Sequence, residues 1–241
     1  MTGTLINIVT VILGGVLGSF LGNRLPEKMR ETVMSGLGLM TAVVGMQMAL
    51  GTQNVLLVMG SVLLGGVLGE WWQLQERLEA FGRWLEAQVN SSGAITDERS
   101  ITRAFVTASL VFCVGPMTIL GSIQDGLTGD YSLLAIKSML DGFAALAFSA
   151  TLGPGVILSI ITIFVFQGGL SLAAMTIGGA LGEVTRQTPW VVEMTAAGGV
   201  LILGISLILL DLRQIRVANL LPAVVLAPAM QVILERLGLA L

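Results

Sequence analysis

Two ionisable residues, Lys137 and Asp141, stand inside an otherwise apolar stretch of the sequence. They are four positions apart, so a helix would place both on one face, where their charges can pair. Ionisable groups within a membrane span are costly and usually face a partner or a cavity, which makes them candidate functional residues. Asp141, beside Ser138, could bind a cation or exchange a proton. The alternative is a structural ion pair in which Lys137 extends toward the outer interface.

A second candidate feature is the Gly115-Pro116 pair in the middle of another apolar stretch. Proline removes a backbone hydrogen bond and clashes with the preceding turn, which leaves carbonyl groups without partners. Such groups are tolerated at membrane depth only inside protein or along a watery cavity. A helix broken here could bind a ligand through its carbonyls and through neighbouring side chains, namely Ser109, Cys113, Thr118 and Ser122. The alternative is a proline kink satisfied by nearby hydroxyls.

Two further segments carry polar groups. The segment 166–169 reads Phe-Gln-Gly-Gly and predicts a second helix break, with Gln167 as a donor and acceptor in apolar surroundings. A glycine-rich connection is predicted over residues 124–132. It could attract cations as an outer mouth or consist of two solvated turns, and its polar residues are Gln124, Asp125 and Asp130. Its spacing does not match a calcium-binding EF-hand loop.

The composition sets the class of protein. Of 241 residues, 54% are hydrophobic and 11% charged, and the mean hydropathy is +0.90. A soluble domain carries about a quarter of its residues as charged groups, so the chain is predicted to be an all-α integral membrane protein. With no histidine and one cysteine, a histidine metal centre, a Ser-His-Asp triad and a disulfide framework are excluded. The net charge of −3 predicts no nucleic-acid partner. We expect no cofactor and no enzymatic activity.

Apolar runs of about 20 residues, the length that spans a bilayer, occur eight times. They cover residues 5–22, 33–50, 55–71, 104–122, 133–152, 156–175, 196–210 and 218–237. These spans occupy most of the chain, which therefore reads as one membrane domain over residues 1–241. The 31 glycines favour closely packed helices, because small residues let membrane helices approach each other.

The basic residues predict the orientation. Nine of the twelve follow spans one, three and seven, and the exceptions are Lys137, Arg186 and Arg236. The positive-inside rule makes that side cytoplasmic, so both termini are predicted to lie outside. The 71–103 segment on this side begins with an amphipathic helix over residues 71–89, with apolar residues at three- and four-residue spacing. Its apolar face could lie in the membrane interface or dock on its own bundle or a sister subunit.

A glycine motif recurs along the chain. Residues 14–18 and 65–69 both read Gly-Gly-Val-Leu-Gly, and residues 178–182 nearly repeat it. Around the first and third copies, Glu31, Gly36 and Leu39 match Glu193, Gly198 and Leu201 at one offset. We interpret residues 1–70 and 176–241 as repeated three-span units flanking the central spans 104–152. Because five spans separate their starts, the second unit would be inverted, an architecture common in secondary transporters with midplane sites.

Several runs of the sequence resemble a known family. Residues 107–117 and 121–127, with Lys137-Ser138-Met139-Leu140-Asp141-Gly142 and Gln167-Gly168, are distinctive. So are residues 65–78 and 219–222. Together they resemble the YqgA/YdfK-like bacterial family of uncharacterised membrane proteins, domain-of-unknown-function family 554, over nearly the whole chain. This resemblance implies a bacterial inner-membrane protein, often described as a transporter.

Two functions from different classes remain in view. The first is a small secondary transporter or channel-like permease, a homo-oligomer in the lipid bilayer, with a small ion or solute bound near the midplane. The broken fourth span, Asp141 and Gln167 would line its path. The second is a membrane scaffold or regulator that recruits a partner through the 71–89 helix. An intramembrane enzyme is third, because histidine, the commonest general base, is absent.

Overall fold

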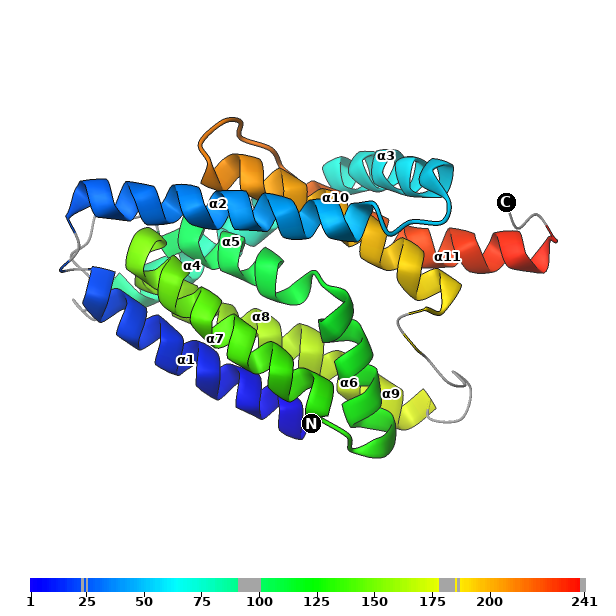
Figure 1. Ribbon diagram of the computed structural model, residues 1–241, viewed down its shortest axis with the longest axis horizontal. Coiled ribbons are helices and arrows are strands. Elements are labelled where there is room, and N and C mark those ends of the chain that lie inside the picture. The colour runs from blue at the N-terminus through cyan, green and yellow to red at the C-terminus, as the bar shows by residue number, and fades with distance from the viewer. Residues whose placement is uncertain (23, 25, 91–100, 178–184, 186, 239–241) are drawn as a thin grey trace. The chain divides into compact units, whose positions relative to one another are not determined.

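A computed structural model describes residues 1–22, 24, 26–90, 101–177, 185 and 187–238 of the chain (Figure 1), and within these ranges all regular structure is helical. The elements are α1 (Thr2–Gly22), α2 (Glu27–Ala49), α3 (Val55–Trp72), α4 (Leu74–Asn90), α5 (Ile101–Cys113), α6 (Pro116–Thr128), α7 (Ser132–Leu152), η1 (Pro154–Leu158), α8 (Ser159–Ile163), η2 (Phe164–Gly168), α9 (Gly169–Ile177), α10 (Pro189–Leu209), η3 (Val217–Leu220) and α11 (Pro222–Arg236).

The helices confirm the predicted class, a polytopic helical membrane protein. Seven segments of the described chain are long and apolar enough to cross a membrane, and the bent pair α5–α6 would make eight. Two spans begin well before their predicted starts, α2 at Glu27 and α10 at Pro189. A hydropathy criterion excludes polar first turns, whereas the helix continues through them; Pro189 stands at the start of α10, where proline is well tolerated.

The fourth span is broken where the sequence predicts it. α5 ends at Cys113, α6 begins at Pro116, and their axes meet at 62°. The break frees backbone carbonyls, and one of them, on Phe112, accepts a hydrogen bond from the Thr118 hydroxyl at 3.1 Å. The structure thus contains the helix break and one hydroxyl that satisfies a carbonyl freed by it.

The chain divides into two compact units, which are described separately. The first contains Met1–Met34, Leu78–Cys113 and Met117–Gly182, and the second contains Ser35–Arg77, Val114–Pro116 and Glu183–Leu241. Each unit therefore combines segments that are distant in the sequence. The single-domain interpretation, which followed the order of the chain, stays a prediction.

In the first unit, α1 and α7 pack along their length, and Figure 1 shows them side by side. A Cβ atom on Gly14 would lie 2.0 Å from the Gly142 carbonyl oxygen, and one on Gly18 would lie 2.1 Å from the Leu146 carbonyl oxygen. No side chain fits at such distances, so the glycine motif of residues 14–18 brings the two backbones into contact.

In the second unit, α3 packs on η3 and α11, and α10 also packs on α11. The glycine motif serves the same purpose here, because a Cβ on Gly69 would lie 1.9 Å from the Asn219 carbonyl oxygen and one on Gly65 would lie 2.5 Å from the Ala223 nitrogen. Two copies of the motif therefore form close helix contacts. The third copy, residues 178–182, lies outside the described residues.

The amphipathic helix α4 starts later than predicted. Gln73 adopts a left-handed conformation, with φ 54°, that ends α3 at Trp72. Trp71 therefore belongs to α3, and its assignment to the amphipathic helix was wrong. Farther along α4, Phe81 meets Phe105 of α5 edge to face at 5.8 Å between ring centroids, and Leu85 is buried. This half of α4 docks on its own unit, one of the two predicted alternatives.

Candidate functional site

The central spans bring the predicted ionisable pair into the interior of the first unit. Lys137 and Asp141 lie one turn apart on α7 and form a salt bridge, and their side chains are 8% and 12% exposed. Between them in sequence, Ser138 is fully buried and donates its hydroxyl to the Leu134 carbonyl oxygen at 2.6 Å. The pair is thus shielded from solvent and held on a helix that packs tightly against α1.

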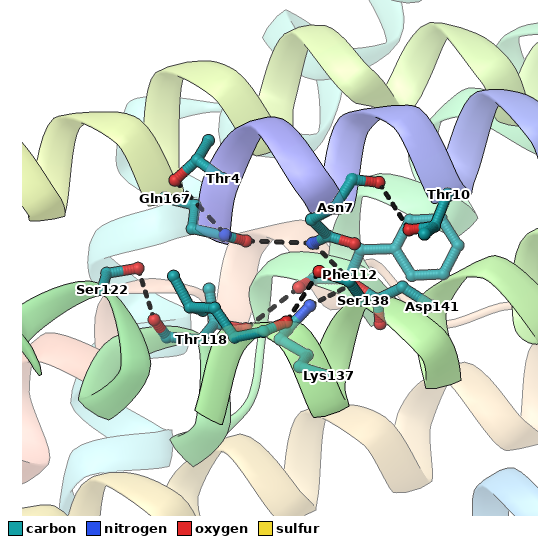
Figure 2. Close-up of polar contacts among 11 residues, drawn as sticks. Thr4, Asn7, Thr10, Phe112, Thr118, Ser122, Lys137, Ser138, Asp141 and Gln167 are labelled. Atoms are coloured by element: carbon teal, nitrogen blue, oxygen red, sulfur yellow. Dashed lines mark hydrogen bonds and ion pairs between the residues drawn. The ribbon is translucent and has the colours of Figure 1, made fainter. Parts of the chain in front are cut away.

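Asn7 of α1 connects this pair to a third element. Its amide nitrogen donates to Asp141 Oδ2 at 2.9 Å and to Gln167 Oε1 at 3.0 Å, and Figure 2 shows it between the two. Gln167 Nε2 in turn donates to the Thr4 hydroxyl at 3.3 Å. We call the five residues Lys137, Asp141, Asn7, Gln167 and Thr4 the central polar chain. It joins α7, α1 and η2.

Gln167 lies in a different local structure from the one predicted. The segment 164–168 is one π-helical turn between α8 and α9, so the helix widens there and does not break. The prediction of a break was wrong because glycines next to Gln167 are tolerated inside a packed membrane helix. A π-turn accommodates an extra residue and is frequent at functional sites. It sets Gln167, fully buried, toward α1.

Asn7 and Thr4 were missed by the sequence analysis. Both are neutral residues near the start of an apolar run, where a search for charges does not find them. One signal was available: they are three positions apart, and Asn7 lies on the same helical face as Gly14 and Gly18. A polar amide on the packing face of a membrane helix indicates an interhelical hydrogen bond.

The other predicted residues of the broken span form local contacts. Ser122 donates to the Thr118 carbonyl oxygen, and Ser109 pairs with Thr162 of α8 at 2.9 Å between hydroxyl oxygens. Cys113 is buried with a free thiol at the end of α5. Gly115 is at the break, with open space where a Cβ would be. In the described part of the chain, these residues form no hydrogen bond to the central polar chain. Pro116 begins α6.

Two of the three predicted outer-mouth residues are inside a helix. α6 continues to Thr128, so Gln124 and Asp125 do not belong to the connection, which was placed too early. Asp125 is 3% exposed and its carboxylate binds the N-terminal ammonium at 3.0 Å. It also accepts the backbone N–H of Gly3 at 3.2 Å. Its role in this structure is to hold the start of α1.

The third, Asp130, is exposed in the short connection between α6 and α7. Its carboxylate accepts the backbone N–H of Ser132 at 3.0 Å. Hydrogen bonds from the side chain and the backbone of Ser132 lower the pKa of Asp130 below its usual 3.8. Asp130 therefore binds the backbone N–H of the first residue of α7 and stays ionised at neutral pH.

A second buried acid, Glu193 of α10, was missed because the span was predicted to begin at Ala196. Glu193 is 1% exposed. It accepts hydrogen bonds from the hydroxyl of Thr52 and from the backbone N–H groups of Gln53 and Asn54, the latter two at 2.8 and 3.2 Å. It thereby fixes the connection between α2 and α3 in the second unit.

The central polar chain brings together polar groups of several chemical kinds. It combines one carboxylate, one ammonium, two carboxamides and a hydroxyl in apolar surroundings. Among the described residues, no group of three or more His, Cys, Asp or Glu could hold a metal ion. The arrangement can bind a small polar species or exchange protons.

Comparison with known proteins gives the family. The model of the family described as "Protein of unknown function (DUF554)" matches residues 2–232. The chain belongs to this family. It is 31% identical to "Uncharacterized protein YqgA" of Escherichia coli (strain K12), over 93% of this chain and 94% of that protein. It is 27% identical to "Uncharacterized membrane protein YdfK" of Bacillus subtilis (strain 168), over 99% of both. No solved structure matches the chain.

These findings confirm the resemblance drawn from the sequence motifs. The matches extend over nearly all of the chain. The names of both relatives describe uncharacterised proteins, and one of them describes a membrane protein. The chain is a multi-pass membrane protein of this family.

Proposed function

We propose that the protein is a small secondary transporter or channel-like permease of the bacterial inner membrane, and that the central polar chain binds its substrate, a small ion or solute. The observation that carries this proposal is the hydrogen-bonded connection from Asp141 through Asn7 to Gln167. Its three residues come from α7, α1 and η2 and are all buried. A transport site would bring together polar groups from separate helices in this way.

The energetics support a functional role. Removing an ion pair from water is expensive, and an apolar replacement of similar size often stabilises a protein as well or better. The backbones of α1 and α7 already touch at Gly14 and Gly18, which we call the glycine seam, so the packing of these helices does not need Lys137 and Asp141. Ligand binding or proton exchange therefore explains the presence of this ion pair beside a π-turn better than a contribution to stability does.

The helix contacts also support the proposed inverted repeat. The repeat matches span one with six, two with seven and three with eight. In the first unit α1 contacts α8 and η2, which belong to span six. In the second unit Gly45 of α2 lies against Gly199 of α10, and α3 packs on α11. Spans that the repeat matches thus contact each other within each unit, although α1 packs more extensively on α7 than on span six.

The remaining parts of the proposal rest on the sequence. We infer that both termini lie outside, from the placement of the basic residues, and that the protein forms a homo-oligomer. Recruitment of a partner through α4 is less favoured, because Phe81 and Leu85 of its apolar face are used in contacts within the first unit. An enzymatic role is also less favoured, since the central polar chain offers one carboxylate and no imidazole.

The proposal can be tested with purified protein in liposomes. Stopped-flow light scattering would follow the entry of sodium chloride, potassium chloride, lithium chloride, glycerol and alanine. We expect at least one probe to enter faster than in protein-free liposomes, and Asp141→Asn to reduce that flux at least tenfold. Met139→Leu is the matched control, because Met139 is on the same helix but 64% exposed.

Folding of each variant is checked by gel filtration in detergent and by circular dichroism. If none of the probes enters faster with wild-type protein than without it, the transport proposal is wrong. An Asp141→Asn variant that folds normally and retains the full flux would remove the central polar chain from the path.

A further inference from the structure

Two buried serines of the first unit have hydroxyl groups without a partner. Ser149 on α7 and Ser171 on α9 are fully buried, and neither Oγ atom forms a hydrogen bond with a described residue. A serine inside a helix can donate to a carbonyl oxygen of the preceding turn. The other buried serines that the structure describes in this unit each bond a carbonyl oxygen or another hydroxyl: Ser109, Ser122, Ser138 and Ser159. Because buried polar atoms are normally paired, the two exceptions indicate contacts for a small hydrogen-bonding molecule.

The central polar chain contains a third atom of this kind. Asn7 is fully buried, and its carbonyl oxygen Oδ1 accepts no hydrogen bond within the described part of the chain. Figure 2 shows this oxygen on the side of Asn7 that faces away from Gln167, toward Thr10. The amide nitrogen is required where it is, because Asp141 Oδ2 is an acceptor that needs its N–H group. The unpaired atom is therefore an acceptor, and a molecule that binds it must donate an O–H or N–H group.

The three unpaired atoms lie at successive levels along the packed helices of the first unit. Ser149 Oγ is 3.5 Å from the position that a Cβ on Gly15 would take, so this hydroxyl faces α1. Gly15 follows Asn7 by about two helical turns, a rise of about 12 Å. Ser171 lies in the opposite direction, because its carbonyl oxygen is 2.3 Å from a Cβ placed on Gly126, next to the acid that holds the start of α1.

The second unit differs in this respect. Among its described residues, the buried polar side chains all form hydrogen bonds, and they are Ser61, Glu193, Ser206 and Asn219. The remaining unpaired atom of the described chain, Arg30 Nε, belongs to the corner between α1 and α2, in the first unit. Unsatisfied hydrogen-bonding capacity is thus concentrated in the unit that contains the central polar chain.

The ionisable groups beside these atoms are paired with opposite charges. Lys137 binds Asp141, and the N-terminal ammonium binds Asp125. Residues 8–14 of α1 and 142–148 of α7, which connect the level of Asn7 to that of Ser149, contain no Asp, Glu, Lys or Arg. An ion in this stretch would lose its water without meeting an unpaired counter-charge, which is strongly unfavourable. An uncharged molecule loses only hydrogen bonds, and the three unpaired atoms can replace them.

Resting on the proposed function, we propose that the substrate is a small uncharged solute with O–H or N–H donors, such as a polyol or an amide, which crosses the first unit by way of Ser171, Asn7 and Ser149. Asn7 Oδ1 accepts a hydrogen bond from the solute, and each serine hydroxyl donates or accepts one. Asp141 is a positioning residue for this contact. By accepting from the amide nitrogen of Asn7, it holds Oδ1 in place for the solute.

The class of substrate has a direct readout in liposomes that contain purified protein. In stopped-flow light scattering, an inward gradient of glycerol or urea first shrinks the liposomes, and their re-swelling reports entry of the solute. We expect at least one of these two solutes to enter at least tenfold faster than in protein-free liposomes. Sodium chloride and potassium chloride should enter no faster than without protein.

Ser149→Ala and Ser171→Ala distinguish a solute contact from a structural hydroxyl. Each removes a hydroxyl that bonds no described group, so the apparent melting temperature should stay the same or rise. Entry of the solute should nevertheless fall at least threefold, because one of its hydrogen-bonding partners is lost. The matched control is Ser206→Ala in the second unit, where the buried hydroxyl donates to the Leu203 carbonyl oxygen at 2.7 Å. This change should leave solute entry unaltered.

The outcomes separate this inference from the transport proposal. If sodium or potassium chloride enters through an Asp141-dependent path while glycerol and urea do not, the inference is overturned and the transporter stands. If either Ser149→Ala or Ser171→Ala keeps the wild-type rate of solute entry, the path does not follow the unpaired atoms and the inference is also overturned. If no probe enters faster than without protein, the transport proposal is wrong and this inference is wrong with it.

Discussion

Asn7 and Asp141 are 134 positions apart in the sequence and share a buried hydrogen bond of 2.9 Å between α1 and α7. The bond is in the same helix pair whose backbones are in contact at Gly14 and Gly18. The glycines bring the helices close enough for a short amide to reach the carboxylate, so packing and polar chemistry are coupled in this pair. A substitution that alters the packing should therefore alter the hydrogen bond, and the reverse should also hold.

Asn7→Leu tests the polar side of this coupling. Leucine has a similar size but cannot donate to Asp141 or Gln167, whose oxygens then lose a partner. We expect a loss of stability of about 1–3 kcal/mol, the usual cost of leaving buried polar groups unsatisfied. The measurement is the apparent melting temperature in detergent. Ser19→Ala, which removes only a local hydroxyl bond to Gly15 on the same helix, should change it little. An Asn7→Leu protein as stable as Ser19→Ala would contradict this prediction.

Glu193 offers a prediction in the second unit. Glu193→Gln replaces a carboxylate that accepts from Thr52, Gln53 and Asn54 by an amide that can accept with only one atom. Charge-assisted hydrogen bonds of this kind contribute about 1.5–3 kcal/mol each. We therefore expect faster hydrogen exchange at the amides of Gln53 and Asn54, measured by mass spectrometry on peptides.

The matched control for Glu193→Gln is Glu31→Gln. Glu31 is the acid at the corresponding position of the proposed repeat, but it is exposed on α2. Its substitution should leave the hydrogen exchange of residues 52–54 unchanged. Equal protection of that connection in wild type and Glu193→Gln would show that the loop is held by other contacts.

A third prediction concerns pH outside the membrane spans. Hydrogen bonds from the Ser132 side chain and backbone lower the pKa of Asp130 below 3.8. A lowered folded-state pKa means that this hydrogen bond contributes fully above pH 3.8 and is lost as the pH falls through the folded value. Ser132→Ala should raise the pKa of Asp130 toward 3.8, as followed by carboxyl NMR of protein labelled at aspartate. A titration curve unchanged by Ser132→Ala would contradict the assignment, and Ser19→Ala serves as the distant control.

How far the sequence predicts the fold depends on the scale of the feature. Apolar runs define the spans because a membrane requires about 20 such residues, and the Gly115-Pro116 break follows from local chemistry. The ends of the spans are harder to predict, since a hydropathy criterion stops short of a charged residue such as Glu193, whereas the helix continues past it. The left-handed turn at Gln73 is likewise invisible to a search for helical periodicity.

Only the part of the candidate site that has a local sequence signal was predictable. The i, i+4 spacing of Lys137 and Asp141 is a local signal, and a glutamine in an apolar run is conspicuous. That Asn7 joins them depends on which helix lies beside α7, and pairing between distant segments is not encoded in one chain's local pattern. The same limit applies to Asp125, which looked like a loop residue and instead binds the N-terminal ammonium.

The last prediction concerns the glycine seam and compares Gly14→Ala with Gly36→Ala, for which we expect opposite effects on stability. A Cβ on Gly14 would lie 2.0 Å from the Gly142 carbonyl oxygen, a backbone atom that cannot swing aside, so Gly14→Ala must push α1 away from α7. Overpacking of this kind costs about 1–3 kcal/mol. It should also weaken the Asn7–Asp141 hydrogen bond and reduce the Asp141-dependent flux in liposomes.

The matched control is Gly36→Ala. A Cβ on Gly36 of α2 meets nothing within 4 Å, and alanine is the better helix former there, so this change should leave the apparent melting temperature unchanged or raise it. If both variants melt alike and transport alike, close backbone contact is not what the glycine motif provides.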